Sequence, residues 1–84
     1  MKSTEVLTVI VKALTTRPES VKVEESTDQM GVLLTLDVAS EDMGKIIGKS
    51  GHTAKAIRSI LRFVGSTENA RVSLKINEPP KQEN

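Results

Sequence analysis

The chain has 84 residues, a net charge of +1 and 37% hydrophobic side chains, which suits one small domain with an aliphatic core and leaves little to wall a deep substrate pocket. It has no cysteine and one histidine, His52, so disulfides, cysteine metal sites and multi-histidine metal sites are excluded, and we expect no metal or cofactor. No apolar run approaches the ~20 residues that span a bilayer, and the N-terminus lacks a signal-peptide core, so we expect a cytoplasmic protein.

Residues 4–15 are predicted to form an amphipathic helix. Its apolar side chains recur at the helical i, i+3, i+4 and i+7 spacing, and they are Val6, Leu7, Ile10, Val11 and Leu14. We expect Ser3 to be the N-cap of this helix. Pro18 ends it, because proline disfavours helical geometry in the residue before it.

Two strands are predicted next, because apolar and polar residues alternate with a period of two. Val21 and Val23 alternate with polar neighbours in the first strand, and residues 32–38 alternate in the second. The polar residues 26–31 between them are expected to form a hairpin loop. The pattern indicates a sheet with one buried face.

The second half of the chain is predicted to hold two helices and a last strand. We expect Ser40 to cap a short helix that ends near Ile47, and a longer helix to run from His52 to Val64 and stop at Gly65. Residues 71–76 alternate as a strand. Residues 1–77 are thus expected to form one domain, and residues 78–84 a disordered tail. The predicted class is α+β in the order α-β-β-α-α-β, a three-stranded sheet with three helices on one face.

The segment Gly48-Lys49-Ser50-Gly51 joins the two predicted helices and is the main candidate for a binding site. Its glycines allow a tight reversal and keep side chains away, so that backbone N–H groups can approach a ligand. The helix that follows begins with unpaired N–H donors and the positive end of its dipole, which suits a phosphate oxygen. Lys49 and Ser50 add a charge and a hydroxyl donor.

Basic side chains surround this loop. Residues 1–42 carry a net charge of −4 and residues 43–84 a net charge of +5, and between residues 43 and 65 there is no acidic side chain. On a helical wheel the basic residues of the second helix share one face, separate from its apolar face. The residues expected to support the site are Lys45, Ile47, His52, Lys55, Arg58 and Arg62. A solvated basic surface would show the same pattern.

The stretch Ile47-Gly48-Lys49-Ser50-Gly51 resembles the start of the I-G-x-x-G-x-x-I signature of the KH domain, although Ala54 stands where that signature ends in isoleucine. Together with the α-β-β-α-α-β order, the chain resembles the type II, bacterial form of this domain, and residues 39–49 look very like the small single-KH proteins of the KhpA/YlqC family.

The resemblance implies a non-catalytic RNA-binding protein that clamps the backbone of about four single-stranded nucleotides at the loop. The bases would lie in an aliphatic groove lined by Ile47 and by sheet-facing residues of the helices and second strand. The resemblance also implies an RNA chaperone or regulator that forms homodimers or pairs with a larger KH-domain protein. Because Phe63 is the only aromatic residue, stacking of bases is almost unavailable.

Three other interpretations compete with this one. A nucleotide-binding P-loop would need glycine at Met43, and it would follow a strand. A DNA-binding helix-turn-helix would leave the three strands unused, and its second helix offers only Arg58 and Arg62 to bases. A dimerisation module with a plain glycine turn stays open as the alternative, with Phe63 contacting either the first helix or another subunit. No nucleophile is predicted beside His52, so no catalytic residue is proposed.

Overall fold

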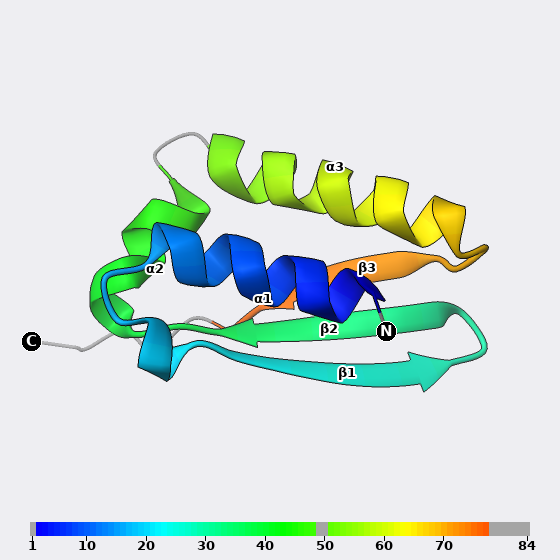
Figure 1. The fold of residues 1–84 in the computed structure, drawn as a ribbon, viewed down its shortest axis with the longest axis horizontal. Helices are drawn as coiled ribbons and strands as arrows, with labels where there is room; N and C mark the ends of the chain where they lie inside the picture. Colours follow the sequence, from blue (N-terminus) through cyan, green and yellow to red (C-terminus); the bar gives the residue numbers. More distant parts are fainter. Residues whose placement is uncertain (1, 49–50, 78–84) are drawn as a thin grey trace, which may run out of the picture.

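The computed structural model describes residues 2–48 and 51–77. The elements in chain order are α1 (Lys2–Leu14), the short 3-10 turn η1 (Pro18–Ser20), β1 (Lys22–Asp28), β2 (Gly31–Asp37), α2 (Ser40–Ile47), α3 (His52–Thr67) and β3 (Val72–Ile76). The three α-helices lie on one face of the sheet (Figure 1), which confirms the predicted α+β class and element order. The predicted tail, residues 78–84, lies outside the described residues. Across the described part of the chain, no helix has the length and apolarity to cross a membrane.

The sheet has the order β1-β2-β3, which the sequence had left open. The hairpin strands β1 and β2 pair antiparallel, with Val23 opposite Leu36, and β2 pairs parallel with β3, with Leu34 opposite Leu74. A parallel pair needs a long crossover connection, and here α2 and α3 provide it. The last strand of the chain therefore becomes an edge strand beside α3 (Figure 1).

The core lies between the central strand and the helices. Alternate residues of β2 face the helices, as predicted, and Leu34 and Leu36 are fully buried. The buried hydrophobic cluster comprises Leu7, Val11, Val32, Leu34, Leu36, Ile46, Ile57 and Leu61. All three helices contribute to it, so one shared core sets their relative positions.

The helix ends differ from the predictions at three residues. Ser3 lies inside the first turn of α1, buried, with no hydrogen-bond partner for its hydroxyl among the described residues, because α1 already begins at Lys2. Ser40 is the first residue of α2 and makes no side-chain cap, since Ala39 holds the extended N-cap geometry. The predicted stop at Gly65 is also wrong, because α3 continues to Thr67.

Gly65 has a packing role instead. A Cβ at this position would lie 2.7 Å from the carbonyl oxygen of Ala70 and 2.8 Å from Cγ2 of Val72. The Gly65 carbonyl accepts hydrogen bonds from the Glu68 N–H at 3.0 Å and from the Ala70 N–H at 2.8 Å. The bare backbone thus lets the end of α3 lie directly against the start of β3.

Asp42 anchors α2 to the segment that follows α1. Its carboxylate is buried and accepts hydrogen bonds from the Thr16 N–H (2.8 Å), the Thr16 hydroxyl (2.8 Å) and the Arg17 N–H (3.1 Å). The backbone hydrogen bond from Thr16 is the largest cause that lowers the pKa of Asp42 below its ordinary value of 3.8, against the opposing effect of burial. The charged carboxylate therefore fixes the helix that leads into the glycine segment.

Gly65→Ala is expected to destabilise the fold, even though alanine is more favourable than glycine inside a helix by about 1 kcal/mol. The new Cβ would meet backbone and a β-branched side chain, which cannot move away cheaply. Gly44→Ala in α2 is the matched control, because nothing lies within 4 Å of its Cβ position, and it should stabilise by about 0.5–1 kcal/mol. Thermal melts of both variants measure the two signs. Equal stabilisation by both substitutions would contradict the close packing at Gly65.

Asp42→Asn is expected to lower the melting temperature at neutral pH by about 5 °C, because an amide can accept from fewer of these donors than a carboxylate. The folded pKa of Asp42 lies below 3.8, so its contribution is complete above that value and is lost as the pH falls through the folded pKa. The melting temperature of the wild type should fall more steeply below about pH 4 than that of the variant. Glu24→Gln, at an exposed position of β1, is the control and should keep the wild-type pH profile. Identical profiles for all three proteins would rule out the carboxylate anchor.

Candidate nucleic-acid interface

The glycine segment begins where α2 ends. Gly48 has φ 69° and ψ 166°, and its N–H donates to the Gly44 carbonyl at 2.8 Å, which closes the helix. Gly51 also has φ 69°, in the left-handed region, and directly precedes α3. Side chains rarely adopt such positive φ values, so both glycines are required by the backbone path. The tip residues Lys49 and Ser50 lie outside the described residues.

The start of α3 presents backbone donors. The first intrahelical bond runs from the Lys55 N–H to the Gly51 carbonyl at 2.9 Å, so the preceding N–H groups of this helix have no intrahelical acceptor. Gly51 makes no side-chain cap, and His52 is exposed. These donors point out of the positive end of a 16-residue helix, an arrangement that suits an anionic oxygen.

A shallow groove of about 290 Å³ adjoins the start of α3. It is lined by Ile47, Gly51, Ala54, Lys55, Arg58 and Ile76. The aliphatic side chains come from the end of α2, from α3 and from β3, and the two basic side chains belong to exposed positions of α3. The groove can therefore hold an apolar ring system beside a charged group.

The structure brings together some of the predicted site residues. Ile47, Gly51, Lys55 and Arg58 line this groove, and Arg62 lines the adjoining hollow between α3 and β3. Gly48 lies at the other end of the glycine segment.

Two predicted residues lie apart from the groove lining. Lys45 is exposed on α2, and its positive charge is among the causes that lower the pKa of Asp42. His52 is exposed in the first turn of α3.

The strand that contributes to the groove lining is β3. The family resemblance had implied that the second strand would line it, and this strand, β2, occupies the middle of the sheet. The sequence analysis therefore missed Ile76, the core-facing residue at the end of β3. The period-two pattern of residues 71–76 was visible, but only the parallel pairing of β3 with β2 brings Ile76 to the glycine segment.

No group of three or more potential metal ligands occurs within residues 2–48 and 51–77. The donors of the site are backbone N–H groups, lysine and arginine, which bind anions and not cations. These groups suit an anionic ligand.

Comparison with known proteins gives one consistent family. The KhpA/KhpB KH domain matches residues 4–76. The RNA-binding protein KhpA of Chlamydia pneumoniae is 49% identical over 74 residues, covering 88% of this chain and 95% of that protein. The RNA-binding protein KhpA of Clostridium acetobutylicum is 44% identical over 72 residues, covering 86% and 96%.

A solved structure agrees at the level of the fold. Aquifex aeolicus Era, in its crystal structure with GDP and AlF4−, superposes with a TM-score of 0.58 at 22% identity, over 89% of this chain and 29% of the longer one. At this identity the likeness concerns the fold alone. The family match spans nearly the whole described chain, including the glycine segment, and the relatives match over almost their full length. This chain therefore belongs to the KhpA/KhpB family of KH-domain proteins.

Proposed function

We propose that this protein binds the backbone of single-stranded RNA at the Gly48–Gly51 segment and acts without catalysis, as an RNA chaperone or post-transcriptional regulator in the cytoplasm. The observation that carries the proposal is the uncapped start of α3 beside a glycine pair with positive φ. Curated relatives named RNA-binding protein KhpA, at 44–49% identity, support RNA as the polyanion.

The site supports a division of roles among its residues. Gly48 and Gly51 shape the clamp, and Lys49 and Ser50 contact phosphate. Bases would lie on the aliphatic surface of Ile47, Ala54 and Ile76, with charge supplied around it. The residues that supply this charge are Lys45, His52, Lys55, Arg58 and Arg62. All of these act by binding, and none requires a chemical step.

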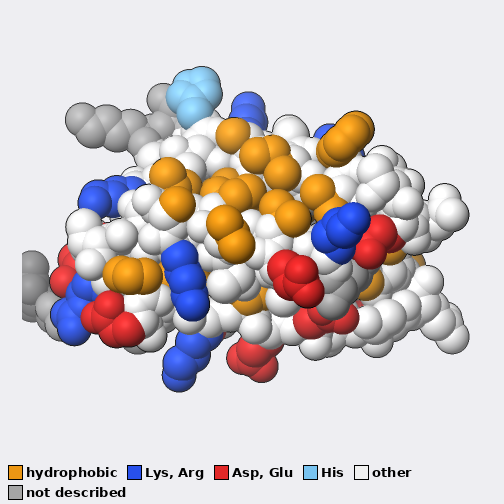
Figure 2. Space-filling view, viewed as in Figure 1, with side chains coloured by type: hydrophobic (Ala, Val, Ile, Leu, Met, Phe, Trp, Pro, Cys, Tyr) orange, Lys and Arg blue, Asp and Glu red, His pale blue; other side chains and the backbone are white. Residues whose placement is uncertain are grey.

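Partner association is the second part of the proposal. Four side chains on the outer side of α1 and α3 are exposed, and together they form the apolar stripe: Val9, Ala56, Ile60 and Phe63. Phe63 is 70% exposed, which argues against burial of its ring on α1. Hydrophobic side chains gather over these helices (Figure 2). We propose that the stripe joins two copies of the chain, with a larger KH-domain protein as the alternative partner on the same surface.

The dimerisation module with a passive loop differs from the main proposal in one consequence. It shares the apolar stripe, but it gives the backbone donors at the start of α3 no role. Changes at the loop therefore separate the two functions.

The double variant Lys49→Asp, Ser50→Asp is expected to weaken RNA binding at least about tenfold, since each charge-assisted contact is worth about 1.5–3 kcal/mol. Wild-type affinity should fall with salt at a log–log slope of roughly −2, as for about three neutralised phosphates of a single strand, and the variant should be flatter. Fluorescence anisotropy with a labelled RNA measures both quantities.

The control is Lys22→Asp, Ser26→Asp, which makes the same charge change at exposed positions of β1. It should bind RNA nearly as the wild type does, and melting curves should show that all three proteins fold. Undiminished binding by the loop variant would exclude the clamp and favour the passive loop.

Phe63→Glu is expected to shift the protein from dimer to monomer, because a charge would enter the apolar contact. Met30→Glu is a matched control, since Met30 is 71% exposed but lies in the turn between β1 and β2. Sedimentation equilibrium over a range of concentrations measures the association. A wild type that stays monomeric would contradict the homodimer and leave the larger KH-domain protein as the partner for this stripe.

A further inference from the structure

Strand β1 is an exposed edge of the sheet. The strand order is β1-β2-β3, and among the described residues no strand lies beyond β1 (Figure 1). Alternate N–H and C=O groups on its outer side are therefore not paired within the sheet, and such an edge can pair with a strand of another molecule. With seven residues, β1 is as long as the central strand, so it offers a full-length template for pairing.

The sequence of β1 is complementary to itself in an antiparallel pair. In the register that joins all seven residues of two copies, the middle residue lies on the two-fold axis. Lys22 of each copy then stands opposite Asp28 of the other, which places opposite charges together at both ends. Val23 stands opposite Thr27, a pair of β-branched side chains that favours strands. A second copy of the chain is therefore the partner that this edge fits.

The middle residue, Glu25, opposes this pairing. It would stand opposite Glu25 of the second copy, and like charges directly opposite each other destabilise a pair of strands. Its side chain lies on the helix-covered face, because Glu25 pairs with the fully buried Leu34 of β2. Continued alternation from Val21 and Val23 would place an apolar residue here. A charged residue on the inner face is one of the features that keep edge strands unpaired.

The carboxylate of Glu25 is held by its own chain. It accepts a hydrogen bond of 2.6 Å from the Thr4 hydroxyl of α1. This hydrogen bond is the largest cause that lowers the pKa of Glu25 below its ordinary value of 4.5, so the group is charged at neutral pH. Pairing of two copies would take water from two facing carboxylates at once, which adds a desolvation cost to their repulsion.

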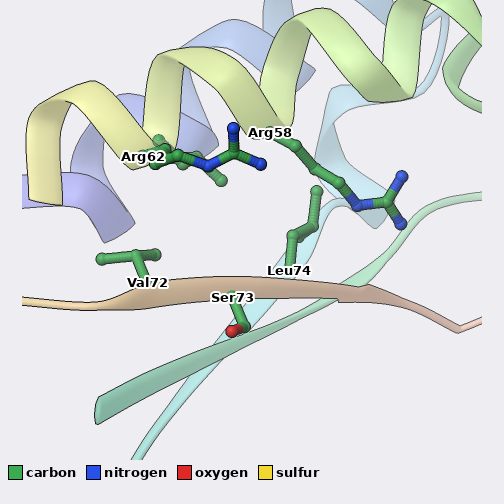
Figure 3. Close-up of a pocket in the computed structure, with 6 residues that line it drawn as sticks. Arg58, Arg62, Val72, Ser73 and Leu74 are labelled. Carbon is green, nitrogen blue, oxygen red and sulfur yellow. The ribbon is translucent and has the colours of Figure 1, made fainter.

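The other edge of the sheet, β3, carries positive charge. Arg58 and Arg62 extend from α3 into the gap above β3, while Val72 and Leu74 point from the strand toward the helix (Figure 3). Two copies that met along β3 would bring guanidinium groups of like charge together, which is unfavourable. The complementary ends of β1 have no counterpart there.

We propose that β1 is an edge at which two copies of the chain would join into one continuous sheet, and that Glu25 prevents this. A protein with two self-complementary surfaces can assemble without end, because each copy is joined to a neighbour at both. Closure of the β1 edge leaves the apolar stripe as the surface for association. Neither RNA binding nor the stripe is needed for this role of Glu25.

The test uses Phe63→Glu as the reference, so that association through the stripe does not obscure association through β1. Glu25→Gln on this background removes the charge and keeps an oxygen that can accept from the Thr4 hydroxyl. This variant should self-associate at least about fivefold more tightly than the reference, because the facing charges are gone. Sedimentation equilibrium measures the association. Hydrogen exchange should show protection of β1 amides, and not of β3 amides, as the protein concentration rises.

Two controls separate the charge from other effects. Glu24→Gln makes the same change at the neighbouring residue, which pairs with Thr35 and lies on the open face of the sheet. Thr4→Val removes the hydrogen bond to α1 and retains the charge of Glu25. Both should associate no more than the reference does, and melting curves should show that every variant folds.

A further substitution tests the register. Lys22→Asp added to Glu25→Gln turns both end pairs of the joined strands into like charges, so it should weaken the association again.

Three results would overturn the proposal. The first is a folded Glu25→Gln variant that associates no more than the reference, which would leave Glu25 as a tether for α1. The second is equal association of the Glu24 and Glu25 variants, which would make net charge the cause. The third is association that protects amides outside β1 or that survives Lys22→Asp, since the contact would then lie elsewhere.

Discussion

The packing of α3 against β3 and α1 is the contact on which the rest of the molecule depends. Ile57 and Leu61 are buried in the core, and this one face fixes the rotation of the helix about its own axis. With that rotation set, the basic residues at positions 55, 58 and 62 must face β3, and the residues at positions 56, 60 and 63 must face solvent. One helix thus divides the surface into a basic side and an apolar side.

Two local contacts fix the positions of α2 and of the C-terminal end of α3. At one end Gly65 brings the backbone of α3 against Ala70 and Val72, so helix and strand meet there without a side chain of residue 65 between them. At the other end Asp42 ties α2 to residues 16 and 17 through three hydrogen bonds. Gly48 and Gly51 therefore adjoin two helices whose own positions are fixed by these contacts.

The sequence was sufficient for the elements and their order, because hydrophobic periodicity is a local property. It predicted the burial pattern of β2 and the face of α3 that carries Lys55 and Arg58. The helix ends were less predictable. Serine is a common N-cap residue, but Ser3 and Ser40 lie within their helices, because capping depends on the backbone geometry of one residue.

The prediction that Gly65 ends the helix was wrong. Glycine is needed at this position because the helix backbone lies against Val72 of β3, seven residues further along the chain. Strand order has the same non-local origin. Periodicity identifies β3 as a strand but not as the parallel neighbour of β2, so Ile76 could not be assigned to the site from the sequence.

The chemistry of the interface limits how tightly one copy can hold RNA. Stacking on aromatic rings is worth about 1–3 kcal/mol per base. The single aromatic residue, Phe63, is exposed and is absent from the lining of the groove. Affinity must come from backbone donors, aliphatic contact and arginine, and the arginine part weakens with salt.

A weak site gains most from being present twice. Two copies joined through the stripe would offer two grooves, and linked sites raise overall affinity by about 10²–10⁴ when the ligand can reach both. In the proposed dimer the apolar stripe would compensate, by repetition of the site, for the absence of aromatic side chains in the groove.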